Sequence, residues 1–247
     1  MRCESCFYST SRSHAAGRRL ESFSQMTTRL ATLPVEHPSA ALLFVQVLGI
    51  LLYPLMGDRS AERLLFGTFG LLVLGAALYV VKRGPWLTWF AVILAIPVVG
   101  LSIWLAFHFD ACRMIIVAGL EAVFYFYATG SLIAYMLEDE FATVDELFAA
   151  GATFTLLAWA FAYVYVVCQA LVPGSFGGLL GSGTPRTWME LLFLSFTTLS
   201  GVGLGDIVPL LPMARALVMI EEFSGVMYLA LVVSRLIALS VKTRTER

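Results

Sequence analysis

Residues 195–209 decide the fold, and they read Ser195-Phe-Thr-Thr-Leu-Ser-Gly-Val-Gly-Leu-Gly-Asp-Ile-Val-Pro209. Glycines at 201, 203 and 205 alternate with other residues, and an aspartate follows directly. Glycine at every second position lets an extended backbone take conformations that side chains forbid. Successive carbonyl groups can then all point toward one axis. We therefore interpret this stretch as a loop that works through its backbone oxygens.

A short apolar segment, Trp188–Ser200, leads into this loop. It is too short to cross a bilayer, which takes about 20 apolar residues. Thr187 and Glu190 have the spacing of a capping box, so the helix is predicted to begin at Trp188. Its carboxyl end then lies near Ser200, deep in the membrane, where the helix dipole favours a cation. The pattern predicts a re-entrant half-helix that ends at the glycine loop.

The composition is that of an integral membrane protein. Of the 247 residues, 59% are hydrophobic and 13% charged, whereas soluble chains run at roughly 45–50% and about 25%. This balance excludes a disordered chain, a nucleic-acid binder and a single water-soluble domain. No Ser/His/Asp, Cys/His or paired-carboxylate arrangement has catalytic spacing. We therefore expect a protein that is not an enzyme and carries no cofactor.

The fold class that we predict is an all-α membrane protein with six transmembrane helices plus the re-entrant helix and its loop. With the amino terminus inside, Lys and Arg are more frequent in the inner segments than in the outer ones. That bias predicts a multi-pass protein of the cell membrane, of the bacterial inner-membrane type, with both termini in the cytoplasm. The expected spans are 41–56, 64–81, 86–107, 114–137, 147–172 and 213–241.

The spans divide the chain into five parts. Residues 1–38 form a cytoplasmic tail, and 39–137 a four-helix membrane domain without the regularly spaced arginines of a voltage sensor. An acidic cytoplasmic linker, 138–146, leads to a second membrane domain at 147–241, which contains the glycine loop. The last part, 242–247, is a short tail. We expect no soluble ligand-binding domain and no conventional voltage gating.

From about 147 to 239 the chain resembles the pore module of tetrameric potassium channels, specifically bacterial single-pore channels with six segments. The resemblance rests on Thr197-Thr198, on Gly-Val-Gly-Leu-Gly-Asp at 201–206, on Pro209, and on Gly225, nineteen residues beyond Asp206 (225 − 206). It implies a homotetramer, since each chain offers one loop and four loops complete the rings of carbonyls around an ion. The implied partners are three identical subunits and membrane lipid.

The resemblance also assigns roles to single residues. The backbone carbonyls that would bind K⁺, or Na⁺, as the permeant ion belong to Gly201, Val202, Gly203 and Leu204. The residues that would support this filter are Thr197, Thr198, Ser200, Gly205, Asp206, Phe193 and Leu194. Gly225 corresponds to the gating hinge of the inner helix. A packing role for Gly225 against the pore helix is compatible with the hinge.

Two filter positions depart from the family pattern Thr-Val-Gly-Tyr-Gly-Asp. Gly201 replaces a threonine whose hydroxyl supplies ligands to the innermost ion site. Leu204 replaces a tyrosine that ties the filter to the pore helix, so we expect an apolar contact with Phe193 and Leu194 instead. Selectivity therefore stays open between a potassium channel and a weakly selective or non-selective monovalent cation channel of the same fold.

Other classes also stay open. A regulatory subunit that does not conduct would share the same sequence features. A transporter with a filter-like loop is less favoured, because related transporters carry four loops in one chain.

Three acids fall within the predicted spans: Glu121, Glu221 and Glu222. An acid inside a membrane is a functional hypothesis by default. The pore helix packs near Glu221 and Glu222, so a structural carboxylate bonded to backbone groups is at least as good an interpretation. Glu121 could sense pH or bind a partner helix. The sequence does not indicate the gating stimulus.

Overall fold

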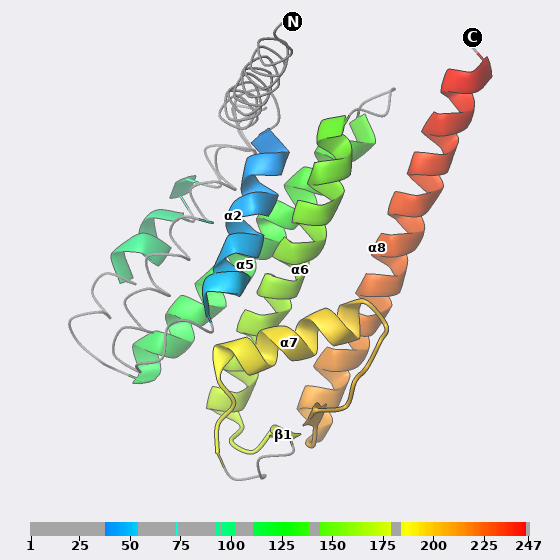
Figure 1. Cartoon of the computed structure of the whole chain (residues 1–247). Coiled ribbons are helices and arrows are strands. Elements are labelled where there is room, and N and C mark those ends of the chain that lie inside the picture. The colour runs from blue at the N-terminus through cyan, green and yellow to red at the C-terminus, as the bar shows by residue number, and fades with distance from the viewer. Residues whose placement is uncertain are drawn as a thin grey trace, which may run out of the picture.

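The computed structural model describes residues 38–53, 73, 92–93, 95–101, 111–138, 144–178 and 184–245. Its elements are the helices α2 (Pro38–Leu52), α5 (Ala111–Glu138), α6 (Val144–Leu171), α7 (Trp188–Leu199) and α8 (Pro212–Thr245), and the strands β1 (Phe176–Gly178) and β2 (Ile207–Pro209) (Figure 1). The predicted tail 1–38 lies outside the described residues except for Pro38. The predicted span 64–81 lies outside them except for Val73, and 86–107 is described only in part.

Helix α6 is the centre of the fold. It packs against α2, α5, α7 and α8, and most extensively against α5. A helix that is apolar on every side is typically buried on every side, and small side chains let neighbouring backbones come close in a membrane. The buried small residues of α6 are Ala149, Ala150, Ala152, Ala158, Ala160 and Ala162.

The predicted acidic linker, 138–146, is shorter in the structure, because α6 already begins at Val144. Asp145 and Glu146 lie in the first turn of α6 and are 7% and 2% exposed. Asp145 accepts hydrogen bonds from the backbone nitrogen and the hydroxyl of Ser39, at 3.2 and 3.0 Å. Glu146 pairs with Arg235 at 3.3 Å. The two acids therefore join the starts of α2 and α6 to α8 at Arg235, rather than facing solvent in a linker.

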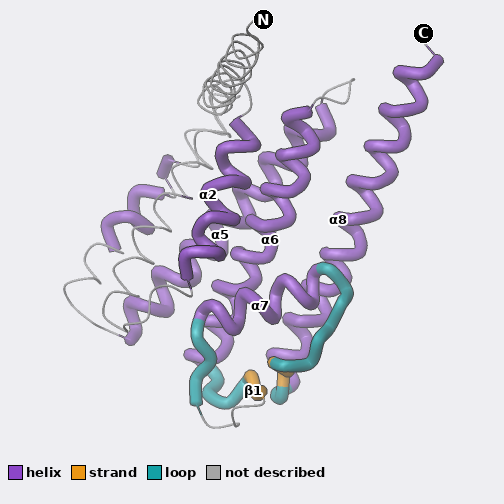
Figure 2. The backbone as a smooth tube through the Cα atoms, in the orientation of Figure 1, coloured by secondary structure: helices purple, strands orange, loops and turns teal. Residues whose placement is uncertain are grey.

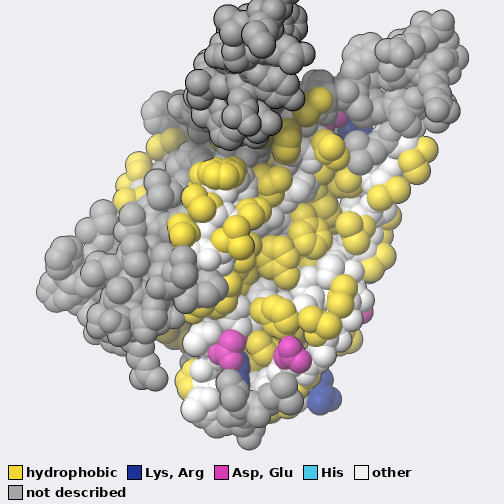
Figure 3. Space-filling view, in the orientation of Figure 1, with side chains coloured by type: hydrophobic (Ala, Val, Ile, Leu, Met, Phe, Trp, Pro, Cys, Tyr) yellow, Lys and Arg dark blue, Asp and Glu magenta, His cyan; other side chains and the backbone are white. Residues whose placement is uncertain are grey.

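Three of the described helices are long and apolar enough to cross a membrane: Met114–Leu137, Val144–Leu171 and Pro212–Arg235. The described helix α2 has 15 residues, fewer than the roughly 20 that a span needs. Figure 3 shows hydrophobic side chains over the middle of the molecule and most of the visible charged side chains near its ends. The six-span count and the tetramer stay predictions.

A short sheet is an addition to the predicted all-α fold. β1 pairs antiparallel with β2, with Phe176 opposite Pro209 and Gly178 opposite Ile207. Figure 2 shows the loop after α7 returning toward the start of α8, close to β1. The sheet thereby fastens the chain before α7 to the chain after the glycine loop. Helix α8 continues to Thr245, so most of the predicted tail 242–247 is helical.

Candidate functional site

Two sets of hydrogen bonds fix the start of α7: a capping box within its first turn, and bonds from α6 to the residue before the cap. Thr187 is the N-cap: the backbone nitrogen of Glu190 donates to its hydroxyl at 3.3 Å, and the backbone nitrogen of Thr187 donates to the Glu190 carboxylate at 2.7 Å. This is the capping box that the sequence predicts. The Gln169 side chain of α6 donates to the Arg186 carbonyl oxygen at 2.8 Å and accepts from the Arg186 backbone nitrogen at 3.0 Å. The half-helix therefore begins at a position fixed against α6.

The start of the glycine loop is hydrogen-bonded to the carboxyl end of α7. The carbonyl oxygen of Thr198 accepts from the Gly201 nitrogen at 2.9 Å, and that of Thr197 accepts from the nitrogens of Val202 and Gly203 at 2.9 and 3.0 Å. The hydroxyl of Ser200 donates to the Phe196 carbonyl oxygen at 2.7 Å. Because the last carbonyls of a helix lack partners within it, these bonds satisfy them and set the direction in which the loop leaves.

Three glycines give the loop its alternating backbone. Gly201, Gly203 and Gly205 have φ of 71°, 55° and 78°, and no described residue other than glycine has a positive φ. L residues strongly disfavour this left-handed region, whereas glycine enters it freely. Alternation of left-handed glycines with ordinary residues turns successive carbonyls to the same side. Such a backbone allows a row of oxygens, which would suit a dehydrated cation.

The side chains of the loop have little cover from their own chain. Val202 and Leu204 are 62% and 58% exposed, and Asp206 is also exposed. Phe193 of α7 is 39% exposed, but Leu194 is buried and lines a cavity of about 220 Å³ behind its own loop. Phe193 therefore has exposed surface that a neighbouring subunit could contact, whereas Leu194 has almost none. The predicted apolar contact with Leu204 stays a prediction for the assembled protein.

Glu221 lies completely buried where three helices meet. Its carboxyl group contacts the hydroxyl of Tyr165 on α6 and the hydroxyl of Ser195 on α7. Ser195 is also 2.8 Å from the carbonyl oxygen of Ala158. Glu221 therefore has the structural role of tying α8 to α6 and α7. Tyr165 and Ser195 were missed from the sequence, since hydroxyls 56 and 26 residues from the acid carry no spacing signal.

The other two predicted acids lie apart from Glu221. Glu222 is exposed on α8 and lines the cavity behind the loop, together with Thr197, Thr198 and the loop glycines. Glu121 is half-buried on α5 and faces Tyr163 of α6. The structure thus places Glu222 beside the glycine loop and Glu121 on α5, against α6.

Gly225 lies against the carboxyl end of α7. A Cβ atom at Gly225 would overlap the Leu199 carbonyl oxygen and stand 2.8 Å from the carbonyl carbon and 2.9 Å from the Cα of the same residue. Backbone atoms cannot rotate out of the way as a side chain can, so the close approach requires glycine. Helix α8 is continuous through this position. The structure therefore shows the packing role, and the hinge stays a prediction.

Residues 151–242 match a family model described as an ion channel. The match covers most of α6, all of α7 with the glycine loop, and nearly all of α8, a little over a third of the 247 residues. No curated protein and no solved structure matches the chain. Together with the three apolar helices, the match supports a membrane protein with an ion-channel domain at residues 151–242, and so a passive ion channel.

Proposed function

We propose that four copies of this chain assemble around an axis and conduct K⁺ through a filter built from their glycine loops. The observation that carries the proposal is the alternation of left-handed Gly201, Gly203 and Gly205 directly after a half-helix, within the ion-channel domain. In this proposal the ions bind the carbonyl oxygens from Gly201 to Leu204. The permeant ion exchanges its hydration shell for those oxygens.

The exposed side of α8 supports an assembly of several copies. Its buried residues fall on one stripe, which includes Ala214, Glu221, Tyr228 and Val232. The remaining face is mostly apolar and largely open in the single chain, with Glu222 among its exposed residues. A pore of this design needs such a face on α8. The face lines the ion path from the filter to the carboxyl-terminal end of α8, and it contacts the neighbouring subunits. Large exposed apolar residues of this face are Met219, Ile220, Phe223, Val226, Met227, Leu229, Val233 and Ile237.

A weakly selective cation channel of the same architecture is the second candidate, and specific residues favour it. Gly201 offers no hydroxyl at the inner end of the filter. The Leu204 side chain has no hydroxyl that could donate a hydrogen bond to α7, and the Phe193 side chain has no atom that could accept one. A filter held by fewer hydrogen bonds is more deformable, so its carbonyls would discriminate less sharply between K⁺ and Na⁺.

Cation flux into liposomes that contain only this protein tests the proposal. The wild type is expected to pass K⁺, and Gly203→Ala to lose most of the flux. Alanine at φ of 55° costs about 1–2 kcal/mol and would turn a filter carbonyl out of line. Gly174→Ala is the matched control, because Gly174 has φ of 80° and equal space for a Cβ, but lies between α6 and β1. Equal flux through both variants would refute the filter assignment, and a wild type without flux would favour the regulatory subunit.

A further inference from the structure

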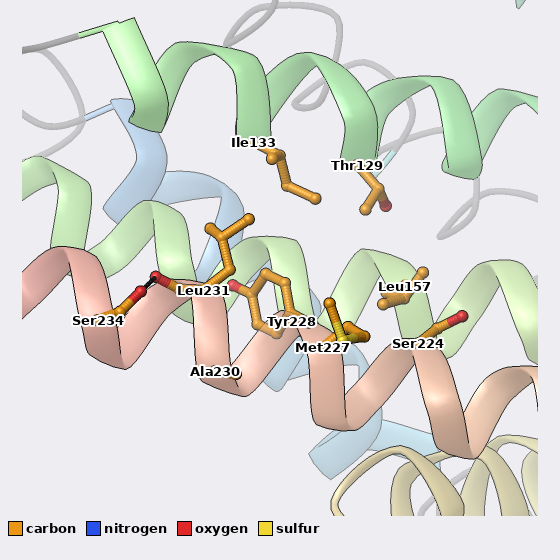
Figure 4. A pocket seen from close by; sticks show the side chains of 9 residues that line it. All are labelled: Thr129, Ile133, Leu157, Ser224, Met227, Tyr228, Ala230, Leu231 and Ser234. Atoms are coloured by element: carbon orange, nitrogen blue, oxygen red, sulfur yellow. Dashed lines mark hydrogen bonds between the residues drawn. The ribbon is translucent and has the colours of Figure 1, made fainter.

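Close packing at the Asp206 end of the glycine loop contrasts with open space along the later part of α8. Figure 4 shows that later part, where Thr129 of α5 and Met227 of α8 are among the residues that line a cavity of about 590 Å³. At the Asp206 end of the loop, by contrast, backbone meets backbone. A Cβ atom at Gly178 of β1 would lie 2.7 Å from the Asp206 carbonyl oxygen. The chain before α7 therefore packs directly against the chain that leaves the loop.

Hydrogen bonds to α7 fix only the first half of the loop. They come from the backbone nitrogens of Gly201, Val202 and Gly203. The backbone nitrogens of residues 204–206 make no backbone hydrogen bond with the described residues. Strand β2 begins directly afterwards, at Ile207, and pairs with β1. The sheet is therefore the next fixed point of the chain after the hydrogen bonds to α7.

Strand β1 is itself fastened to the end of α6. Phe176 is 3% exposed, and the centre of its ring lies 5.1 Å from that of Tyr165 on α6. Ser175 is fully buried: its hydroxyl donates to the Val172 carbonyl oxygen at 2.6 Å, and its own carbonyl oxygen accepts from the Leu210 nitrogen at 2.8 Å. These contacts join the end of α6 to the chain that leaves the loop. The position of β2 therefore depends on α6 through β1.

Gly178 is the residue of β1 that meets the end of the loop. Besides the Asp206 carbonyl oxygen, a Cβ atom at Gly178 would lie 3.5 Å from a guanidinium nitrogen of Arg186 and 3.7 Å from the Ile207 side chain. Arg186 is 5% exposed and pairs with Glu190 of α7 at 3.4 Å. Neither backbone nor a buried, paired arginine moves aside easily. A side chain at Gly178 would therefore push β1 away from the loop.

We propose that β1 positions the Asp206 end of the filter, and that Gly178 determines ion selectivity through this contact. Gly178 is a positioning residue, because it touches Asp206 rather than the permeant ion. Leu204 and Phe193 cannot form a hydrogen bond between their side chains that would hold this half of the loop against α7, so the sheet takes that role. The effect on selectivity rests on the proposed channel function, whereas the positioning of the loop does not.

Hydrogen exchange, measured by mass spectrometry on the full chain in lipid nanodiscs, tests the positioning without any ion flux. In Gly178→Ala the new methyl group displaces β1 from the loop. The amides of residues 204–210 should then exchange about 2- to 10-fold faster than in the wild type, the effect of losing about one hydrogen bond. The amides of α7 should exchange at the wild-type rate, which would show that the rest of the domain is folded. Equal exchange of residues 204–210 in variant and wild type would overturn the proposal.

Gly177→Ala is the matched control, because it adds the same methyl group to the neighbouring residue of the same strand. Neither glycine has a positive φ, so alanine fits the backbone at both positions. A Cβ atom at Gly177 would lie 2.8 Å from the Cδ1 atom of Leu210, the end of a side chain that can rotate away. Exchange at residues 204–210 should stay at the wild-type rate. An equal rise in both variants would show a general effect on β1 and would contradict the role of Gly178.

A second variant, Phe176→Leu, loosens β1 from α6 and adds no atom beside Asp206. It loses the ring contact with Tyr165, so β1 is held less firmly and residues 204–210 should again exchange faster. This variant decides the question if Gly178→Ala does not fold. A wild-type exchange rate in Phe176→Leu would refute the dependence of the loop on β1.

The ratio of K⁺ to Na⁺ permeability, obtained from the reversal potential in liposomes, tests the effect on selectivity. It should fall about 2- to 10-fold in Gly178→Ala, by the same loss of about one hydrogen bond, and stay unchanged in Gly177→Ala. A purely structural role would lower the unfolding temperature and leave the ratio equal in both variants, which would overturn the selectivity assignment. A wild type without flux would refute the channel proposal, whereas the exchange rates would still test the positioning.

Discussion

Replacement of Gly225 by alanine tests how closely α8 and α7 are packed. The added methyl group would meet the backbone of Leu199, which is fully buried. Overpacking of this kind costs about 1–3 kcal/mol, partly offset by about 0.5–1 kcal/mol because alanine is the better helix former. We expect a net loss of about 1–2 kcal/mol per subunit. Thermal unfolding of the purified protein in detergent should show a midpoint about 2–8 °C lower.

The filter should respond as well, because Leu199 is the last residue of α7 and the loop leaves directly after it. Cation flux through Gly225→Ala is therefore expected to fall together with the unfolding temperature. Gly130→Ala is the control: it adds the same methyl group to a helical glycine of α5, where the new Cβ atom would have no neighbour within 4 Å beyond its own turn of helix. That variant should be as stable as wild type or slightly more so.

The same pair of variants separates packing from hinge. If Gly225 acts only as a hinge, the Gly225→Ala variant should unfold at the wild-type temperature while the channel opens less often. A variant with both the stability and the flux of the wild type would refute the close contact with Leu199.

Three further predictions concern the contacts that position the pore helix and the end of α8. Thr187→Ala removes the N-cap and should lower the stability by about 1 kcal/mol, measured by thermal unfolding; no change would show that Gln169 alone fixes this end. Glu221→Ala removes two interhelical hydrogen bonds, each worth about 0.6–1.7 kcal/mol in a membrane. The unfolding temperature and the cation flux should therefore both fall. Arg235→Met removes the cation that pairs with the buried Glu146 at 3.3 Å, which should cost about 3–5 kcal/mol; adding Glu146→Gln should restore most of the stability, and a double variant no better than the single one would refute the ion pair.

Local patterns explain why some of the site was predictable from the sequence. The capping box of Thr187 and Glu190 spans three residues, so the start of α7 follows from spacing alone. The alternating glycines likewise imply positive φ angles, which the structure has at 201, 203 and 205. Both features are set by residues that are neighbours in the chain.

Features built from distant residues were not predictable. Asp145 and Glu146 look like part of a solvated linker, yet both are buried because Ser39 and Arg235 reach them from 106 and 89 positions away. The antiparallel pairing of β1 with β2 also escapes the apolar pattern, because three-residue strands are too short to show a period. Tertiary contacts, rather than local propensity, decide these positions.

The reversal potential of liposomes that hold only this protein, with K⁺ on one side and Na⁺ on the other, tests the central claim most directly. We predict a clear current and a reversal potential close to the K⁺ limit, which would mean that the carbonyls from Gly201 to Leu204 discriminate without a threonine hydroxyl. A clear current that reverses near zero would contradict potassium selectivity and favour the weakly selective cation channel.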